Sequence, residues 1–200
     1  MPTLFVVRHG NTFDAGDVVT RVGGRTDLPL SVSGWKQAEA LAGHFAETRF
    51  TAALASPLER TRATARAILG KRPDAPALLV RSFLREVDYG PDENQPEEAV
   101  AARLGEAALK AWDTDGTVPP GWRVDPAAIR AGWDSLLKEI AELPVTAKVL
   151  VVTSNGVARF LPDVVMVTPK KFDRKLKTGA WGEVVIDPQV TGISEWNRRP

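Results

Sequence analysis

The chain has 200 residues, of which 26 are basic and 25 acidic, so its formal charge at pH 7 is only +1. This balance gives no electrostatic reason to expect binding to nucleic acid or to an anionic membrane surface. The absence of cysteine excludes a disulfide framework, a cysteine-based zinc site and a thiolate nucleophile. No apolar stretch has the length of a membrane span and no signal-peptide pattern is present, so we expect one cytoplasmic domain over residues 1–200.

The first predicted strand ends at reactive side chains. Residues 4–7 form a short apolar run, Leu-Phe-Val-Val, that is typical of a buried strand, and Arg8 and His9 follow it. Ligands of open α/β sheets bind beyond the carboxyl ends of the strands. His9 is one of two histidines in the chain, and the pattern therefore places it where chemistry is usually done. Asn11 and Thr12 follow and are candidate hydrogen-bond donors.

Residues 13–30 contain glycines, aspartates and one proline without helical periodicity, which predicts a loop. A helix is then expected to begin with Ser33 as its N-cap and to continue to about residue 47, with apolar residues at helical spacing. His44 lies at the margin of this apolar stripe. We interpret it as a surface or partly packed histidine rather than a catalytic one.

The second predicted strand, residues 52–55, leads into Ser56-Pro57-Leu58-Glu59, which has the form of a capping box with proline at the first helical position. Arg60 would then lie in the first turn of a helix. The unpaired amides and dipole of a helix start favour an anion, and Arg60 would add a fork of donors.

The rest of the chain continues to alternate between strand and helix patterns. Strands are predicted over 77–80, 149–153, 183–186 and 192–196, and helices over 97–112 and 127–143. This alternation predicts an α/β fold, a three-layer α/β/α sandwich with a mostly parallel central sheet.

Two polar segments allow more than one interpretation. Residues 113–117, Asp-Thr-Asp-Gly-Thr, follow a helical pattern and precede two prolines, so we expect a polar loop, or alternatively part of a lid with Trp122. The second segment is a basic run, for which a solvated face is expected and recruitment of an acidic substrate is the alternative. Its residues are Lys170, Lys171, Arg174, Lys175 and Lys177.

Four motifs together resemble the histidine phosphatase superfamily, which includes the cofactor-dependent phosphoglycerate mutases. They are Arg8-His9-Gly10-x-Thr12, Ser56-Pro57-Leu58-x-Arg60, Leu84-Arg85-Glu86, and a block from Gly24 to Ala38 with Gly34 and Gln37 within it. The resemblance covers roughly the whole chain and implies a phosphoglycerate mutase-like fold.

This resemblance assigns roles to individual residues. His9 would attack phosphorus and form a phosphohistidine that water then cleaves. Glu86 would protonate the departing oxygen and later take a proton from the attacking water. The implied phosphate-binding residues are Arg8, Arg60, Asn155, Asn11 and Thr12, and Arg21, Arg25 and Glu93 would lie in the loops that contact substrate. The chemistry requires no metal and no cofactor, and inorganic phosphate or sulfate is expected to bind at the same place. We also expect the free nitrogen of His9 to be held by a backbone carbonyl near Gly10.

One residue departs from the family pattern. The family has a histidine between a serine and a glycine after the strand at 149–153, and this chain has Asn155 there. The sequence therefore favours a phosphomonoester hydrolase that acts on a small phosphorylated metabolite with weak or restricted activity. A non-catalytic phospholigand-binding protein on the same fold is the alternative, and a phosphoglycerate mutase-type phosphotransferase is the least favoured reading.

Overall fold

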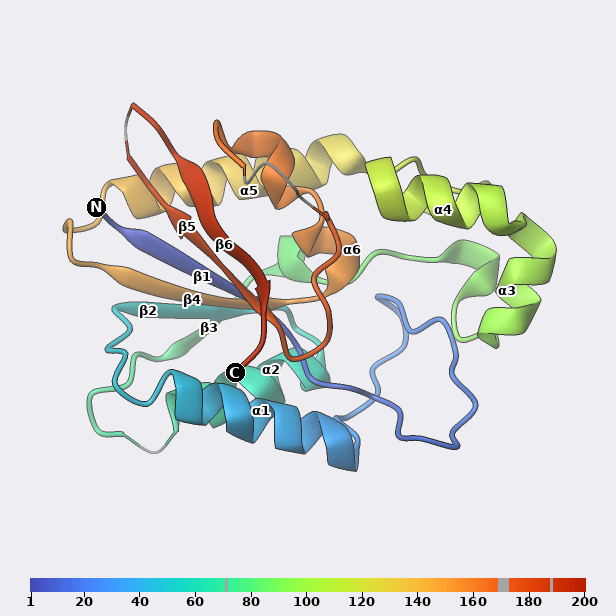
Figure 1. Cartoon of the computed structure of the whole chain (residues 1–200), viewed down its shortest axis with the longest axis horizontal. Helices are drawn as coiled ribbons and strands as arrows, with labels where there is room; N and C mark the ends of the chain where they lie inside the picture. The colour runs from blue at the N-terminus through green and yellow to red at the C-terminus, as the bar shows by residue number, and fades with distance from the viewer. Residues whose placement is uncertain (71, 169–172, 188) are drawn as a thin grey trace.

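The computed structural model describes residues 1–70, 72–168, 173–187 and 189–200 (Figure 1). The strands in these ranges are β1 (Thr3–Arg8), β2 (Ala52–Ala55), β3 (Leu78–Val80), β4 (Lys148–Thr153), β5 (Trp181–Val185) and β6 (Gly192–Arg198). The α-helices are α1 (Val32–His44), α2 (Glu59–Leu69), α3 (Glu97–Leu104), α4 (Glu106–Asp115), α5 (Pro126–Ala141) and α6 (Asn155–Ala158). Within the described ranges, no helix combines the length and the apolar character needed to span a membrane.

The strands form one six-stranded sheet in the order β3-β2-β4-β1-β5-β6. The first four of these strands are parallel, whereas β5 runs antiparallel to both of its neighbours. This sheet confirms the predicted α/β fold with a mostly parallel sheet. The register pairs Arg8 with Thr153, so His9 and Ser154 leave the sheet side by side at its carboxyl edge.

Two hydrophobic cores lie on opposite faces of the sheet. Because side chains alternate along a strand, Leu4 and Val6 of β1 join the core that contains Trp133 of α5, whereas Val7 joins the core that contains Leu41 of α1. Figure 1 shows α1 and α2 below the sheet and α5 above it. Each fully buried leucine or valine contributes roughly 1.5–3 kcal/mol, and together these contacts fix β1 at the centre of the three layers.

Two predicted helix starts are wrong. The N-cap of α1 is Ser31, whose Oγ accepts a hydrogen bond from the Gly34 amide at 3.1 Å, and Ser33 is already helical. The predicted capping box at 56–59 is absent, because the Ser56 hydroxyl pairs with Thr61 Oγ1 at 2.7 Å and α2 begins only at Glu59. Arg60 nevertheless lies in the first turn of α2, as expected.

The predicted helix over 97–112 is two helices, α3 and α4. Gly105 separates them with a φ of +79°, a left-handed conformation that glycine adopts without steric cost. Helix α4 then continues through Asp115, so the predicted loop at 113–117 is wrong for its first three residues. As a result, Trp112 and Asp113 lie on α4, which borders the cavity described below.

Candidate active site

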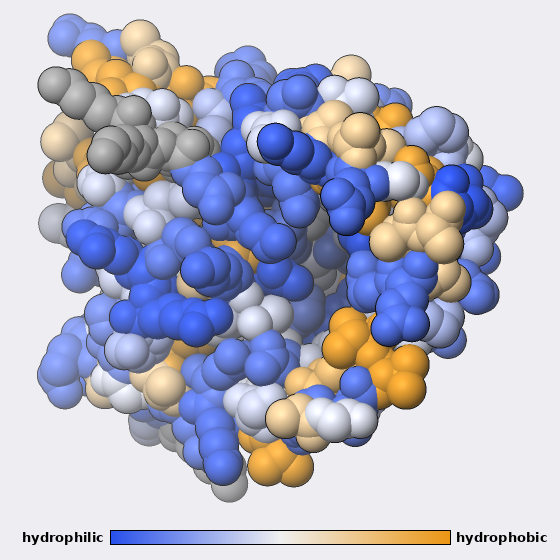
Figure 2. Space-filling view, turned by 45° about the vertical axis from the view of Figure 1, so that its right-hand side comes forward, coloured by the Kyte–Doolittle hydropathy of each residue, from blue (hydrophilic) through white to orange (hydrophobic). Residues whose placement is uncertain are grey.

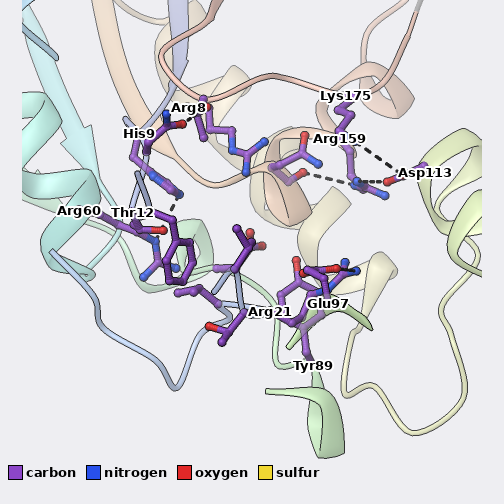
Figure 3. A pocket seen from close by; sticks show the side chains of 18 of the residues that line it. Arg8, His9, Thr12, Arg21, Arg60, Tyr89, Glu97, Asp113, Arg159 and Lys175 are labelled. Atoms are coloured by element: carbon purple, nitrogen blue, oxygen red, sulfur yellow. Dashed lines mark hydrogen bonds and ion pairs between the residues drawn. The ribbon is translucent and has the colours of Figure 1, made fainter. Parts of the chain in front are cut away.

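A cavity of about 520 Å³ lies between the carboxyl edge of the sheet and helix α4. Figure 2 shows a hollow near the centre of one face of the molecule, bordered mainly by hydrophilic residues. One part of the cavity, here called the His9 end, is lined by Arg8, His9, Arg60, Glu86 and Asn155. The other part, the α4 end, is lined by Arg21, Glu97, Trp112, Asp113, Arg159 and Lys175. Figure 3 shows His9 and Arg60 on one side of the cavity and Asp113, Arg159 and Lys175 on the other.

The imidazole of His9 is held in one tautomer. It is 5% exposed, and its Nδ1–H donates to the Gly10 carbonyl at 2.7 Å, the bond expected from the sequence. Its Nε2 accepts a hydrogen bond from Arg60 Nε at 3.2 Å, so Nε2 carries the lone pair. Burial, and then the positive charges of Arg60 and Arg8, hold the pKa of His9 well below its usual value of 6.5. His9 is therefore neutral at pH 7, with Nε2 as the nucleophilic atom.

The two arginines at the His9 end are fixed by backbone carbonyls. Arg60 is 1% exposed and donates to the carbonyls of Thr26 and Gly23 at 2.9 and 3.2 Å. Arg8 donates to the Leu176 carbonyl at 2.9 Å, and its Nε is buried without a hydrogen-bond partner. Burial lowers the pKa of both guanidinium groups, which still remain charged at neutral pH. Within the described ranges neither forms an ion pair with a carboxylate, so both charges are available to an anion.

Glu86 and α6 fit closely against each other. The two carboxylate oxygens of Glu86 accept hydrogen bonds from the amides of Val87 and Gly156, at 2.9 and 3.3 Å. A Cβ on Gly156 would lie 2.1 Å from Glu86 Oε1, so a side chain at this position would displace the Glu86 carboxylate from its present place. Asn155 is 8% exposed, and its Oδ1 accepts from the Leu176 amide at 2.8 Å, which leaves its Nδ2 as the donor toward the cavity.

The cations at the α4 end are all paired with carboxylates. Arg21 contacts Glu97 at 2.5 Å. Asp113 takes two partners, Arg159 NH2 at 3.2 Å and Lys175 Nζ at 3.7 Å. The guanidinium of Arg159 also lies 4.1 Å from the centre of the Trp112 ring. The three cations at this end therefore share two carboxylates, which leaves one positive charge in excess.

Comparison with known proteins decides the family. The model of the histidine phosphatase superfamily, branch 1, matches residues 4–199. The chain belongs to this superfamily. It is 28% identical over 179 residues to 2,3-bisphosphoglycerate-dependent phosphoglycerate mutase 2 of Gloeobacter violaceus, which covers 87% of this chain and 80% of that one.

Two solved structures share the fold of this histidine phosphatase over nearly its full length. The mycobacterial glucosyl-3-phosphoglycerate phosphatase superposes with a TM-score of 0.79 and 20% identity, covering 99% of each chain. The α-ribazole phosphatase from Shigella flexneri superposes with a TM-score of 0.74 and 20% identity, covering 98% of this chain and 96% of the other. Both confirm the phosphoglycerate mutase-like fold.

The cavity of this histidine phosphatase contains most of the side chains predicted from its sequence. Those that line it are Arg8, His9, Asn11, Thr12, Arg21, Arg60, Glu86 and Asn155. Asn11 is already engaged, because its Nδ2 donates to Ser33 Oγ at 3.1 Å and its Oδ1 accepts from Thr178 Oγ1 at 2.5 Å. Arg174 pairs with Asp163, and Lys170 and Lys171 lie outside the described residues. Within the described ranges no group of three or more metal-ligating side chains is gathered.

Arg25 and Glu93 are not brought into the cavity. Arg25 is exposed and pairs with Asp88 at 3.0 Å. The carboxylate of Glu93 accepts from the amides of Arg25 and Tyr89, at 2.8 and 3.1 Å. These two residues thus join the loop at 13–30 to the segment after Glu86.

The start of α2 was expected to bind an anion through its free amides, but a carboxylate of the chain itself accepts a hydrogen bond there. Asp27 Oδ1 accepts a hydrogen bond from the Glu59 amide at 2.7 Å, so this helix start already has a carboxylate as its anion. A second carboxylate anchors the same loop to α1, where Asp14 accepts from the amides of Val32 and Ser33 at 3.0 and 2.9 Å. Hydrogen bonds from Ser33 lower the pKa of Asp14 to about 2.

Tyr89, Trp112 and Arg159 are among the cavity residues that sequence reasoning missed. Arg159 stands four residues after Asn155, which is one helical turn and the same face, so its position could have been inferred from the spacing. Tyr89 and Trp112 carried no such signal. In the sequence both look like ordinary aromatic residues. Only the fold brings α4 and the segment after Glu86 to the same cavity.

Proposed function

We propose that this histidine phosphatase hydrolyses the phosphomonoester of a small metabolite through a phosphohistidine at His9. The observation that carries the proposal is the state of the imidazole: neutral, with Nδ1–H bound to the Gly10 carbonyl and Nε2 beside the Arg60 guanidinium. A phosphate dianion is matched by the charges of Arg8 and Arg60, which lack carboxylate partners in the described part of the chain. The phosphatases among its structural relatives support the same reaction class.

The proposed reaction has two displacements at phosphorus. His9 Nε2 bonds to phosphorus while the ester P–O bond breaks, and Glu86 gives its proton to the departing alkoxide oxygen. Water then attacks the phosphohistidine, Glu86 takes a proton from that water, and the P–N bond breaks to release inorganic phosphate. Arg8 and Arg60 hold the charge on the transferred phosphoryl oxygens in both steps. As phosphate enters, Arg60 Nε exchanges its bond to His9 for one to a phosphoryl oxygen.

We further propose that Asn155 stands where the family has its distal catalytic histidine. The Nδ2 group of Asn155 still offers a donor, but without the positive charge of an imidazolium. Loss of a whole oxyanion donor costs on the order of 100- to 1000-fold in rate, so this neutral replacement lowers kcat by at most that factor. Asn155→His is expected to raise kcat for phosphomonoesters. A variant no faster than the parent would show that the asparagine does not limit the reaction.

Trapping of the covalent intermediate tests the main proposal. The protein is mixed with a phosphomonoester carrying radioactive phosphorus and quenched at alkaline pH, because phosphohistidine is labile in acid. Wild type and His44→Gln are expected to retain label, whereas His9→Ala retains none. If none of the three is labelled although inorganic phosphate binds, the chain is instead a non-catalytic phospholigand-binding protein, the reading that the neutral Asn155 favours.

A further inference from the structure

We infer that Gln37 and Thr64 are positioning residues for the reaction of His9. They fix the two peptide groups of Gly10, whose carbonyl selects the reactive tautomer of the imidazole. This inference rests on the proposed function, in which Nε2 of His9 attacks phosphorus. Neither Gln37 nor Thr64 lines the cavity, so both act on the reaction through Gly10 rather than through contact with substrate.

The tautomer of the imidazole depends on the direction of one carbonyl group. A neutral imidazole carries its proton on either nitrogen, and a proton on Nε2 would occupy the lone pair that attacks phosphorus. The Gly10 carbonyl accepts the hydrogen bond from Nδ1–H of His9 at 2.7 Å and so keeps the proton away from Nε2. Because glycine adopts a wide range of backbone angles, the groups around Gly10 have to fix the direction of this carbonyl.

Gln37 of α1 holds the peptide group that contains this carbonyl. The Asn11 amide lies in the same rigid peptide plane as the Gly10 carbonyl, and it donates to Gln37 Oε1 at 2.8 Å. A rotation of this plane that turned the carbonyl away from His9 would also break the bond to Gln37. Gln37 therefore keeps the carbonyl directed at the imidazole.

Thr64 of α2 holds the preceding peptide group. Its hydroxyl donates to the Arg60 carbonyl at 2.9 Å, and the same oxygen accepts a hydrogen bond from the Gly10 amide at 3.2 Å. Thr64 is buried and lies four residues after Arg60, on the same face of α2. The Arg60 guanidinium bonds to Nε2 of His9, so one face of α2 contacts both the imidazole and the peptide that orients it.

Gly10 is packed against both helices. It is buried, and a Cβ on it would lie 2.3 Å from the carbonyl oxygen of Gly34 in α1. Gln37 follows Gly34 by three residues, so α1 supplies both a packing surface and a hydrogen bond on one face. Figure 1 shows α1 and α2 on the same side of the sheet. The two helices therefore hold Gly10 from two directions.

The bond to Gly10 matters most once substrate is bound. In the free protein, Arg60 Nε also donates to Nε2 of His9 and favours the same tautomer. Under the proposed function this donor moves to a phosphoryl oxygen as phosphate enters, and the Gly10 carbonyl still holds the imidazole. Loss of the support from Gln37 or Thr64 is therefore expected to lower kcat more than it raises KM.

Two substitutions that each remove one hydrogen-bonding group test the inference. Gln37→Met and Thr64→Val keep the approximate size of the side chain. Misplacement of a reacting group by about 1 Å can cost about 100-fold in rate. We therefore expect kcat for propyl phosphate to fall about 10- to 100-fold in each variant, with KM within about threefold of wild type. Thr64→Ser keeps the hydroxyl, and its kcat is expected to stay within about threefold of wild type.

Thr61→Val is the matched control. Thr61 is a second buried threonine of α2, and its hydroxyl bonds to Ser56 and to the Leu58 carbonyl instead of Gly10. Its Tm is expected to fall as in Thr64→Val, because each variant loses buried hydrogen bonds, but its kcat is expected to stay within about threefold of wild type. Equal losses of kcat in the two variants would indicate a general loosening of α2, and the inference would be wrong.

NMR of the imidazole nitrogens separates this inference from the proposed function, because it needs no turnover. The chain has two histidines, so protein with 15N-labelled histidine shows two rings, and His44→Gln assigns them. We expect wild-type His9 to carry its proton on Nδ1 with slow exchange to water. Gln37→Met and Thr64→Val are each expected to exchange this proton at least about tenfold faster, since its bond opens more often.

The NMR result decides the inference whether or not an ester is hydrolysed. If both variants keep the wild-type exchange rate, or if the wild-type proton is on Nε2, the inference is wrong. If exchange becomes faster as expected but wild type hydrolyses no ester, the proposed function fails and the positioning of His9 stands. Gln37 and Thr64 lie on different helices, so either variant alone reports on the Gly10 carbonyl if the other does not fold.

Discussion

The two ends of the cavity hold cations of similar kind and use them in different ways. At the His9 end, Arg8 and Arg60 are bound by carbonyl oxygens, which fix the side chains without cancelling their charge. At the α4 end, Arg159 and Lys175 share the single carboxylate of Asp113, which cancels only one of their two charges. The comparison teaches that a count of basic residues around a cavity says little about anion binding. The partner of each cation decides whether its charge is available.

The largest effect is expected for the nucleophile itself. His9→Ala removes the proposed nucleophile and is expected to lower kcat/KM about 10⁴-fold or more, while inorganic phosphate is expected to bind still through Arg8 and Arg60. His44→Gln is the matched control, because His44 packs on Phe45 and Trp181 away from the cavity. Its kcat/KM is expected to stay within about twofold of wild type. A His9→Ala protein that keeps its activity would show that the reaction does not depend on the His9 end of the cavity.

Arg60→Lys tests whether the geometry of an unpaired guanidinium matters beyond its charge. Lysine keeps the charge but loses the fork that reaches His9, Thr26 and Gly23. We expect kcat/KM to fall about 10²- to 10³-fold, comparable to loss of an oxyanion donor. Arg66→Lys, at an exposed position of the same helix, is expected to change kcat/KM less than about twofold. Circular dichroism and Tm of both variants check that the fold is retained.

Acid sensitivity should also originate at the His9 end. Because burial and the neighbouring arginines lower the pKa of His9 in the folded protein, the unfolded chain binds this proton more readily below about pH 6.5. The free energy of unfolding therefore falls as pH decreases from about 6.5 toward the folded pKa, by at most about 1.4 kcal/mol per pH unit, and it is unaffected by this group above that window. Denaturant unfolding at several pH values is expected to show a shallower dependence of the unfolding free energy on pH in His9→Gln than in wild type. Equal slopes in wild type and His9→Gln would contradict this origin.

The smallest effect is expected at the α4 end. Asp113→Asn leaves Arg159 and Lys175 without their shared carboxylate, so their charges become available to substrate. We expect kcat/KM for the phosphate ester of 3-hydroxypropanoate to rise about threefold, since a half-exposed ion pair is worth little in free energy. Propyl phosphate serves as the uncharged reference. If both esters respond equally, the charges of Arg159 and Lys175 do not act on the carboxylate of the substrate.

The sheet and the His9 end could be predicted from the sequence because their signals are local. The apolar run before Arg8 and His9 marks a buried strand, and the family motifs assign Arg60 and Glu86 to the same edge.

The α4 end could not be predicted, because its signals depend on tertiary contacts. One glycine, Gly105, divides an alanine-rich run that periodicity alone reads as a single helix. Asp113 read as a loop residue, although it forms the ion pair that neutralises Arg159. Arg25 and Glu93 followed the family motif in sequence but turned out to hold loops together. Ion pairs between residues that are far apart in the sequence leave no periodic pattern from which they could be predicted.

The central place of β1 also has a consequence for how the chain is made. The strand that precedes His9 is synthesised long before its two sheet neighbours, Lys148–Thr153 and Trp181–Val185. On the ribosome, Thr3–Arg8 therefore has no partner strand until residues 148–153 have emerged. Its apolar residues are open to chaperones and to other nascent chains during that interval, and the cavity beside His9 is assembled late in folding.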